Sequence, residues 1–492
     1  MSEAVSLDPR RLNVLATGME RGLPIYDSLL RLEADGTIVP WRAAGMTSTD
    51  NVVWTLTLRD DVTFTDETPL DADAVVYNID RHRAPDSLSV GKGQLADVVD
   101  VRAVDELTVQ ITLGTASGGF PTILTAESPV GFIGSPTAVK ADPEGFGQHP
   151  VGAGPFMVEE WVRDDHLTLV RNPDCWQEGL PRLDSLRFVI TPDDQSRVDT
   201  LRTGGIDLTA GDPANYRAIL GDDRFVVHPQ SGAQFIFLNE STIAGQDQRL
   251  RRAIQLAFDP DEAEAVIFGP DSSWDGDTSC LPFFASSGLC LEEAVEPDRE
   301  EARRLVAEYL ADGNSARLAL TINKQKVTDA EFIQATLNGI GLDIEIVGLD
   351  ATEMFSNEIE GKYELAWSGL SSLTSFYPRA YSQFHSSGLN LVKHTNSAFD
   401  GALVQGRDGA TAEDRQDGWR RMLEIVRDDA RSLVGVGGHH ARLRNPVSVH
   451  DLQAHAALVL EPVDTFVRHD AFRRGLLAEE RGDGADVMMA VG

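Results

Sequence analysis

The segment ARLALTINKQKVTDAEFIQATLNGIGLDIEIVGL, residues 316–349, decides the fold class of this chain. Residues 316–325 and 342–349 are each expected to form a strand, and residues 329–341 between them a helix. A strand, a helix and a second strand in this order predict parallel strands joined by a right-handed crossover, and hence an α/β fold. Sheets of this kind bind ligands at the carboxyl ends of their strands, where Asn323–Lys326 is expected.

A capped helix is expected upstream of this unit, in DPDEAEAVIFG, residues 259–269. Asp259 is a candidate N-cap, and Pro260 suits the first helical position. Glu262 would complete a capping box, and Gly269 would end the helix.

The N-terminal half contains alternating segments that indicate strands. In VVWTLTLRDDVTF, residues 52–64, apolar and polar side chains alternate, which predicts a hairpin that turns at Arg59–Asp61. The segment LDADAVVYNIDRHR is expected to form a helix capped by Asp71. Residues 107–113 read as another strand.

Length and charge bound the class of protein. A chain of 492 residues exceeds the size of a single growing core, and no low-complexity linker separates its parts, so two or three interleaved lobes are expected. The 78 acidic and 43 basic side chains leave a net charge of −35, which argues against binding to nucleic acid or anionic membranes and otherwise favours solubility. The sequence has no run of apolar residues long enough to span a membrane, and MSEAVSLDPRRL has no signal-peptide core.

The chain has three cysteines, and the spacing of two of them favours an exported protein. Cys280 and Cys290 bracket a short loop rich in turn formers, where a disulfide would stabilise the fold by roughly 2–3 kcal/mol. Two unpaired thiols are the alternative. Cys175 is left as an odd, buried thiol.

The sequence contains no catalytic or cofactor motif: G-x-S-x-G, H-E-x-x-H, Walker A and G-x-G-x-x-G patterns are all missing. We therefore expect neither an enzyme nor a bound cofactor. His439 and His440, with His450 and His455 downstream, could form a metal site, but adjacent residues of a strand point to opposite faces. A structural or surface role for these histidines is favoured, and no metal site is predicted.

Aromatic side chains gather in YELAWSGLSSLTSFYPRAYSQF, residues 363–384. The segment starts as a strand and continues into a polar stretch. Its rings suit either a ligand pocket or a loop that packs on the core through its own aromatics. They are Trp367, Phe376, Tyr377, Tyr381 and Phe384.

Six motifs follow one another in order over nearly the whole chain. They are IYDSLLRLEADGTIVPW from Ile25, WTLTLRDDVTFTDETPLDADAVVYNIDR from Trp54, VGAGPFMVEEW from Val151, VRNPDCW from Val170, LRTGGIDL from Leu201 and FLNESTIAGQDQRLRRAIQLAFDPDEAEAVIFG from Phe237. This series resembles the family 5 extracytoplasmic solute-binding proteins of ABC importers, which carry dipeptides, oligopeptides and nickel chelates.

The resemblance implies a periplasmic-binding-protein-like fold of type II, cluster C, with two lobes, a hinge and a small extra subdomain. Lobe I would comprise residues 1–31, 148–234 and 444–492, the extra subdomain 32–147, and lobe II 235–443. In VGAGP, Gly152 and Gly154 would supply permissive backbone dihedrals and Pro155 a rigid entry into the next strand.

Three residues depart from the family pattern. Asp61 and Glu67 stand where the family has turn glycines, and Cys175 stands where it has a tyrosine before Trp176. In the pocket loop after the Trp367 strand, peptide-binding relatives generally carry an aspartate that this chain lacks. This favours a neutral or anionic ligand, such as a modified peptide, an oligosaccharide or a metal chelate, over a peptide with a free amine.

The resemblance also implies a receptor that binds a solute between two lobes and delivers it to a permease. It would be a monomer outside the cytoplasm, with its export signal outside this sequence and lipid anchoring left open. A nickel-chelate or oligosaccharide receptor is the alternative within the family, and a secreted hydrolase the alternative from another class. The expected ligand-binding residues are Met19, Gln234, Phe235, Lys324, Trp367, Ser371, Thr374 and Tyr377.

Overall fold

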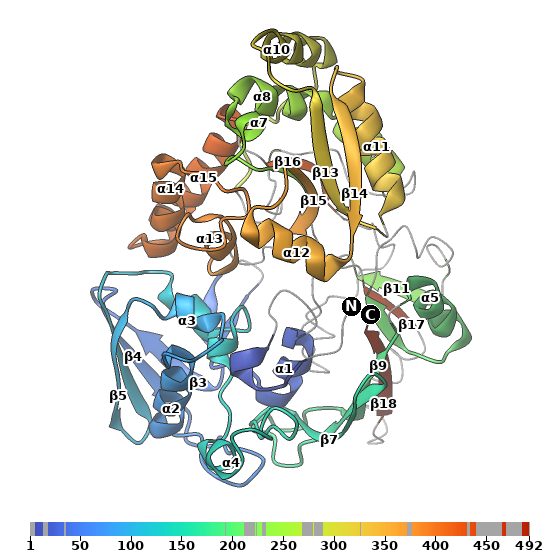
Figure 1. Cartoon of the computed structure of the whole chain (residues 1–492). Coiled ribbons are helices and arrows are strands. Elements are labelled where there is room, and N and C mark those ends of the chain that lie inside the picture. The colour runs from blue at the N-terminus through green and yellow to red at the C-terminus, as the bar shows by residue number, and fades with distance from the viewer. Residues whose placement is uncertain are drawn as a thin grey trace. The chain divides into compact units, whose positions relative to one another are not determined.

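The computed structural model divides the chain into two compact units (Figure 1). Unit 1 comprises residues 1–230 and 443–492, and unit 2 comprises residues 231–442. The residues that the structure describes are 5–12, 18–33, 36–191, 193–210, 222, 224–228, 233–267, 279, 289–324, 326–370, 376–430, 433–438, 465–468 and 485–491. Within these ranges no helix is both long and apolar enough to cross a lipid bilayer.

A four-stranded antiparallel sheet forms one part of unit 1, in the order β3-β4-β6-β5. Its strands are β3 (Ala43–Thr47), β4 (Val53–Leu58), β5 (Val98–Asp105) and β6 (Thr108–Leu113). Helix α2 (Ala72–Arg83) packs on β5 and begins where predicted, since Asp71 accepts a hydrogen bond of 2.8 Å from the amide of Ala74.

The alternation along β4 is confirmed, because Trp54, Leu56 and Leu58 are buried while the residues between them are less so. The predicted hairpin across Arg59–Asp61 is wrong. Strand β4 is central and pairs with β3 and β6 on its two edges, so it has no free edge for the residues that follow the turn. Thr63 instead makes an isolated bridge to Pro69.

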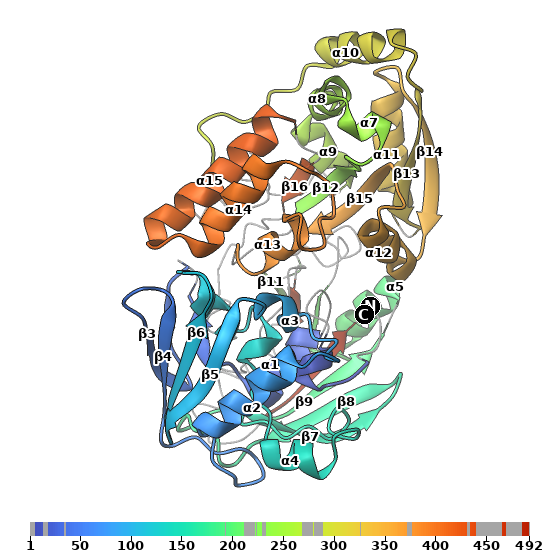
Figure 2. The same cartoon turned by 60° about the vertical axis from the view of Figure 1, so that its left-hand side comes forward.

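The second sheet of unit 1 has seven strands in the order β11-β17-β10-β18-β9-β8-β7. They are β7 (Phe156–Val162), β8 (His166–Arg171), β9 (Leu183–Ile190), β10 (Leu208–Ala210), β11 (Phe225–His228), β17 (Thr465–Arg468) and β18 (Ala485–Val491). Strands β7, β8 and β9 form an antiparallel meander (Figure 2). Strand β18 lies between β9 and β10 and is parallel to both.

Short elements complete unit 1. The helices are η1 (Pro9–Arg11), α1 (Gly18–Tyr26), α3 (Gly91–Gln94), η2 (Phe120–Leu124), η3 (Pro129–Gly131), α4 (Pro136–Ala141) and α5 (Asp194–Thr203), and β1 (Leu30–Leu32) pairs with β2 (Ile38–Pro40). Helix α1 packs on β7, and Met19, Ile25 and Tyr26 enter the same apolar cluster as Phe156 and Phe188 of the large sheet.

The VGAGP motif owes its glycines to a close approach of two backbones. A Cβ atom on Gly152 would lie 2.1 Å from the carbonyl oxygen of Ile25, and one on Gly154 would lie 2.3 Å from that of Pro24. Neither glycine has a positive φ, so the expectation that they supply unusual dihedrals is wrong. They let the chain run against the last turn of α1, where the Gly154 amide donates to the Ile25 carbonyl at 2.8 Å.

The RNP motif is tied to this crossing. The side-chain amide of Asn172 donates to the carbonyl of Gly154 at 2.9 Å, and the backbone amide of Asn172 donates to that of Pro155 at 2.8 Å. The two sequence motifs thus serve one local structure.

Unit 2 is built on a five-stranded sheet in the order β14-β13-β15-β12-β16. Its strands are β12 (Ala233–Leu238), β13 (Arg317–Asn323), β14 (Asp343–Leu349), β15 (Leu365–Leu370) and β16 (Leu433–Gly438). Strand β13 is parallel to β14 and to β15, while β12 is antiparallel to β15 and β16. With α11 (Val327–Asn338) between β13 and β14, the predicted βαβ unit is confirmed.

Helices flank this sheet (Figures 1 and 2). They are α7 (Ile243–Gln246), α8 (Gln248–Ala257), α9 (Pro260–Ile267), α10 (Arg299–Ala311), α12 (Ala351–Glu360), α13 (Arg379–Phe384), α14 (Ser397–Asp408) and α15 (Ala412–Asp428). Helices α8, α9, α10 and α11 share one apolar core with the sheet.

Helix α9 starts at Pro260, as predicted, with Asp259 accepting from the amides of Asp261 at 3.0 Å and Glu262 at 3.3 Å. The Glu262 carboxylate forms an ion pair with Arg299 at the start of α10 instead of returning to the backbone of Asp259. Half of the predicted capping box is therefore confirmed, and the reciprocal bond from Glu262 is wrong. Gly269 lies outside the described residues.

Candidate functional site

Three parallel strands of unit 2 end side by side and form what we term the carboxyl edge: Asn323–Lys324, Leu349–Asp350 and Trp367–Leu370. In the register of these strands Asn323 pairs with Leu349, and Thr321 with Ala366. Ser368, two residues after Ala366, therefore lies level with Asn323. In open α/β sheets ligands bind at such an edge.

The first strand of unit 2 begins at the same edge. Strand β12 is antiparallel to β15, and its residues Gln234 and Phe235 pair with Gly369 and Ser368. The structure thus brings the backbones of Gln234, Phe235 and Lys324, three expected site residues, to one edge of one sheet. The Phe235 side chain is buried and stacks on Phe237, with ring centroids 6.3 Å apart.

An exposed ion pair marks the edge. Lys324 Nζ lies 2.6 Å from Asp350 Oδ1, and the two side chains are 57% and 67% exposed. Asp350 occupies the N-cap position of α12, yet its side chain makes no capping hydrogen bond. Exposed ion pairs contribute little to stability, so either group can exchange its partner for a ligand charge. The sequence interpretation missed Asp350, which supplies a carboxylate outside the pocket loop where one was sought.

Trp367 faces the core of unit 2. Its side chain is 3% exposed, and its indole N–H donates to the Asp329 carboxylate of α11 at 2.9 Å. Neighbouring residues of a strand point to opposite faces, so Ser368 projects from the other side of the sheet, where Glu358 of α12 lies.

Glu358 is a buried carboxyl group beneath the carboxyl edge, with a residue exposure of 1%. Burial raises its pKa to about 7, and the hydrogen bond with the Ser368 side chain lowers it in part. The sequence held a signal for this residue that went unused. Glu358 follows the buried Met354 by four positions, so an acidic side chain occupies the apolar face of a helix.

Tyr377 packs within an aromatic series on the helices of unit 2. Its ring meets that of Tyr381 edge to face at 6.1 Å, and Tyr381 stacks on His385 at 4.5 Å. The Arg407 guanidinium lies 4.3 Å from the centre of the Tyr381 ring. Tyr377 is 9% exposed.

The other expected residues lie elsewhere or outside the description. Met19 is buried in α1 of unit 1, with an exposure of 1%. The side chain of Gln234 lies outside the described part of the structure, as do Ser371 and Thr374. Their roles stay predictions.

The cysteines and histidines divide similarly. Cys290 is disulfide-bonded and Cys175 is free, whereas Cys280 lies outside the described residues, so the pairing of Cys280 with Cys290 stays a prediction. Burial raises the pKa of the Cys175 thiol. His439 and His440 are also outside the description, and the described residues contain no group of three or more side chains able to hold a metal ion.

Comparison with known proteins places this architecture. Residues 37–390 match the family described as bacterial extracellular solute-binding proteins, family 5 Middle. The glutathione-binding protein GsiB of Salmonella paratyphi A is 29% identical over 373 residues, which cover 73% of this chain and 70% of that protein. The nickel-binding periplasmic protein of Escherichia coli is 26% identical over 370 residues, 69% of this chain and 68% of that protein.

Solved structures agree. The periplasmic binding protein DppA from Helicobacter pylori in complex with the peptide STSA has a TM-score of 0.78 at 20% identity, covering 95% of this chain and 92% of that one. NikZ from Campylobacter jejuni in complex with Ni(L-His) has a TM-score of 0.76 at 17% identity, with the same coverage. The predicted periplasmic-binding-protein-like α/β fold is confirmed, and the chain belongs to the family 5 bacterial extracellular solute-binding proteins.

Proposed function

We propose that this protein is the substrate receptor of an ABC importer, which binds a peptide-like or other small solute outside the cytoplasm and delivers it to membrane permease subunits. It acts as a monomeric receptor and not as an enzyme. Family membership over residues 37–390 supports the transport role. Relatives named for glutathione and for nickel define the solute classes to test first.

The exposed Lys324–Asp350 pair is the observation that supports a charged solute. A ligand carboxylate can replace Asp350 at the Lys324 ammonium, and a ligand ammonium can replace Lys324 at the Asp350 carboxylate. A zwitterion such as a short peptide can do both at once. The pocket loop alone argued against a free amine, and Asp350 removes that objection.

The direct test is a binding panel. We would measure thermal shifts and then calorimetric affinities with reduced glutathione, triglycine and the complex of nickel with histidine. The purified protein would first be examined by native mass spectrometry for a co-purified solute. A solute that binds only the folded state raises the melting temperature, and the shift grows with the logarithm of the solute concentration once that concentration exceeds Kd. No shift with any probe, together with a bare mass, would count against the receptor assignment.

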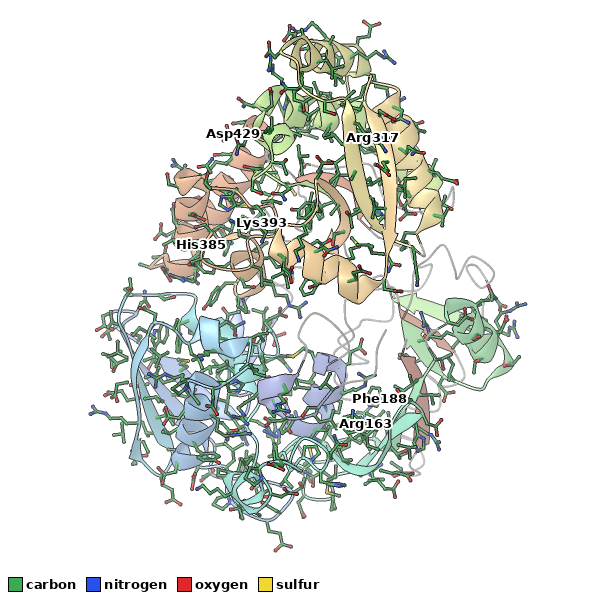
Figure 3. All side chains as sticks on the ribbon, in the orientation of Figure 1. Arg163, Phe188, Arg317, His385, Lys393 and Asp429 are labelled. Atoms are coloured by element: carbon green, nitrogen blue, oxygen red, sulfur yellow. The ribbon has the colours of Figure 1, made fainter. Side chains whose placement is uncertain are left out.

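A matched pair of variants locates the site. Lys324→Ala removes the cation at the carboxyl edge and is expected to weaken the binding of a carboxylate probe roughly tenfold. Arg317→Ala is the control. The Arg317 guanidinium pairs with the Glu345 carboxylate at 2.8 Å, and the Arg317 side chain is 67% exposed. Arg317 lies at the amino end of β13, the strand whose carboxyl end leads to Lys324 (Figure 3). Its loss is expected to leave affinity unchanged, and equal losses in both variants would place the site elsewhere.

A further inference from the structure

Glu358 is a buried acidic side chain that the described contacts of unit 2 satisfy only in part. Its Oε1 atom is buried and makes no hydrogen bond. Its described hydrogen-bond partner is the Ser368 side chain. A carboxylate buried in this way is costly unless it is fully bonded or carries a proton. Glu358 is therefore poorly suited to a purely structural role as an anion.

Ser368 connects this buried group to the surface of the carboxyl edge. It lies level with Asn323 in the strand register and is half-buried. The residue after it, Gly369, is exposed, and Lys324 follows Asn323 on the neighbouring strand. A serine hydroxyl has one hydrogen to donate and two lone pairs to accept with. One side of Ser368 can thus meet Glu358 while the other meets a solute.

The protonation of Glu358 decides which way the Ser368 hydrogen points. An ionised carboxylate only accepts, so it takes the Ser368 hydrogen and leaves lone pairs towards a solute. A protonated carboxyl donates to Ser368 Oγ, and the Ser368 hydrogen is then released for a solute acceptor. We propose that Glu358 is a positioning residue that makes Ser368 a hydrogen-bond donor to the solute when Glu358 is protonated and an acceptor when it is ionised.

Several other titratable groups around α12 have partners of their own. Tyr363, which follows α12, donates to the carbonyl of Leu391, and burial together with the charges of Glu358 and Glu240 raises its pKa. Lys393 donates from Nζ to the carbonyls of Ile359 at 2.7 Å and Leu389 at 3.0 Å (Figure 3).

The ends of α12 are paired as well. Lys324 at the end of β13 pairs with Asp350, and Lys362 pairs with Glu360. Ser368 is the side chain that shares a hydrogen bond with Glu358, and the proton on Glu358 therefore acts directly on it. Because burial raises the pKa of Glu358 to about 7, the exchange falls within the neutral range of pH.

This inference rests on the proposed function and narrows the solute class. Lys324 provides a cation at the same edge, so the solute group beside Ser368 is expected to be a carboxylate or carbonyl oxygen. Such a group gains a hydrogen bond from Ser368 at low pH and loses it at high pH. One hydrogen bond of this kind changes affinity by about 3- to 10-fold.

The first experiment needs no solute. The carboxylic acid band of the full chain would be followed by infrared spectroscopy against pH. We expect a carboxyl group that titrates near pH 7, disappears in Glu358→Gln, and persists in Glu353→Gln, which alters an exposed residue of the same helix. In Ser368→Ala the midpoint should rise, because the bond that stabilises the ionised form is lost. A titration near pH 7 that persists in Glu358→Gln, or a midpoint that does not move in Ser368→Ala, overturns the proposal.

The second experiment measures affinity for the same three probes at pH 6 and pH 8. For each protein we would take the ratio of its affinity for a carboxylate probe at pH 6 to its affinity at pH 8. This ratio should be about 3- to 10-fold larger in the wild-type protein than in Glu358→Gln. Both proteins meet the same solute protonation, so the comparison isolates Glu358. Identical ratios would overturn the solute contact. Failure of every probe to bind would instead count against the proposed receptor function, while the infrared titration still decides the proton exchange.

Discussion

At the scale of single residues, Glu67 stands in a backbone conformation that favours glycine. Its φ is 65°, and its side chain is exposed. The family motif that this segment resembles has glycine at this turn, whereas this chain adopts the left-handed geometry with glutamate, which does not adopt it freely. We expect Glu67→Gly to raise the free energy of unfolding by about 1 kcal/mol, as measured by urea denaturation.

Asp61 provides the control, since it also replaces a family glycine but has no positive φ. Its carboxylate pairs with Arg59 at 2.6 Å. Asp61→Gly should therefore leave stability unchanged or lower it slightly. A stabilisation equal to that of Glu67→Gly would show that backbone strain is not the cause.

Glu358 also makes stability depend on pH. Its pKa is raised by burial from 4.5 to about 7 in the folded protein, so the folded state holds the proton more tightly than the unfolded state does. The resulting stabilisation is fully present below about pH 4.5, is lost as the pH rises to about 7, and stays lost above that. Relative to the wild type, Glu358→Gln should gain about 3 kcal/mol of stability between pH 5 and pH 8. Urea denaturation at both pH values checks this, and a constant difference would contradict it.

At the scale of elements, the VGAGP segment lies so close to the last turn of α1 that an added methyl group should disrupt their contact. A Cβ atom at Gly154 would lie 2.3 Å from the carbonyl oxygen of Pro24, which is backbone and cannot swing aside. We expect Gly154→Ala to destabilise unit 1 by about 3 kcal/mol or more, as measured by thermal or urea unfolding. Gly45→Ala in β3 is the control, because a Cβ there meets no atom within 4 Å. Equal effects would exclude steric contact as the cause.

Elements whose partners are close in sequence were predictable, and others were not. The βαβ unit of β13, α11 and β14 follows from local periodicity, and α2 follows from its Asp71 cap. The prediction of a hairpin after β4 was wrong because β6, about fifty residues later in the chain, pairs with the edge of β4 that the hairpin required. Local patterns describe a strand well and its neighbours poorly.

At the scale of the whole molecule, the ordered motifs identified the fold and the family, while the candidate site was only partly predictable. Lys324 could be placed at the carboxyl end of its strand from the sequence. Glu358 could not be connected to Ser368, because that contact depends on how α12 settles on the sheet. Trp367 was expected to bind ligand because it opens a polar segment rich in aromatic residues, but its side chain faces the core and donates a hydrogen bond to Asp329.

The position of β18 has a consequence for how the protein is made. Residues 485–491 fill the place between β9 and β10, strands synthesised roughly three hundred residues earlier. All five strands of the unit 2 sheet come from one continuous stretch, residues 231–442. Unit 2 can therefore complete its sheet during synthesis, while the large sheet of unit 1 must wait with a gap at its centre. Unit 1, whose synthesis begins first, is therefore the unit whose sheet is completed last.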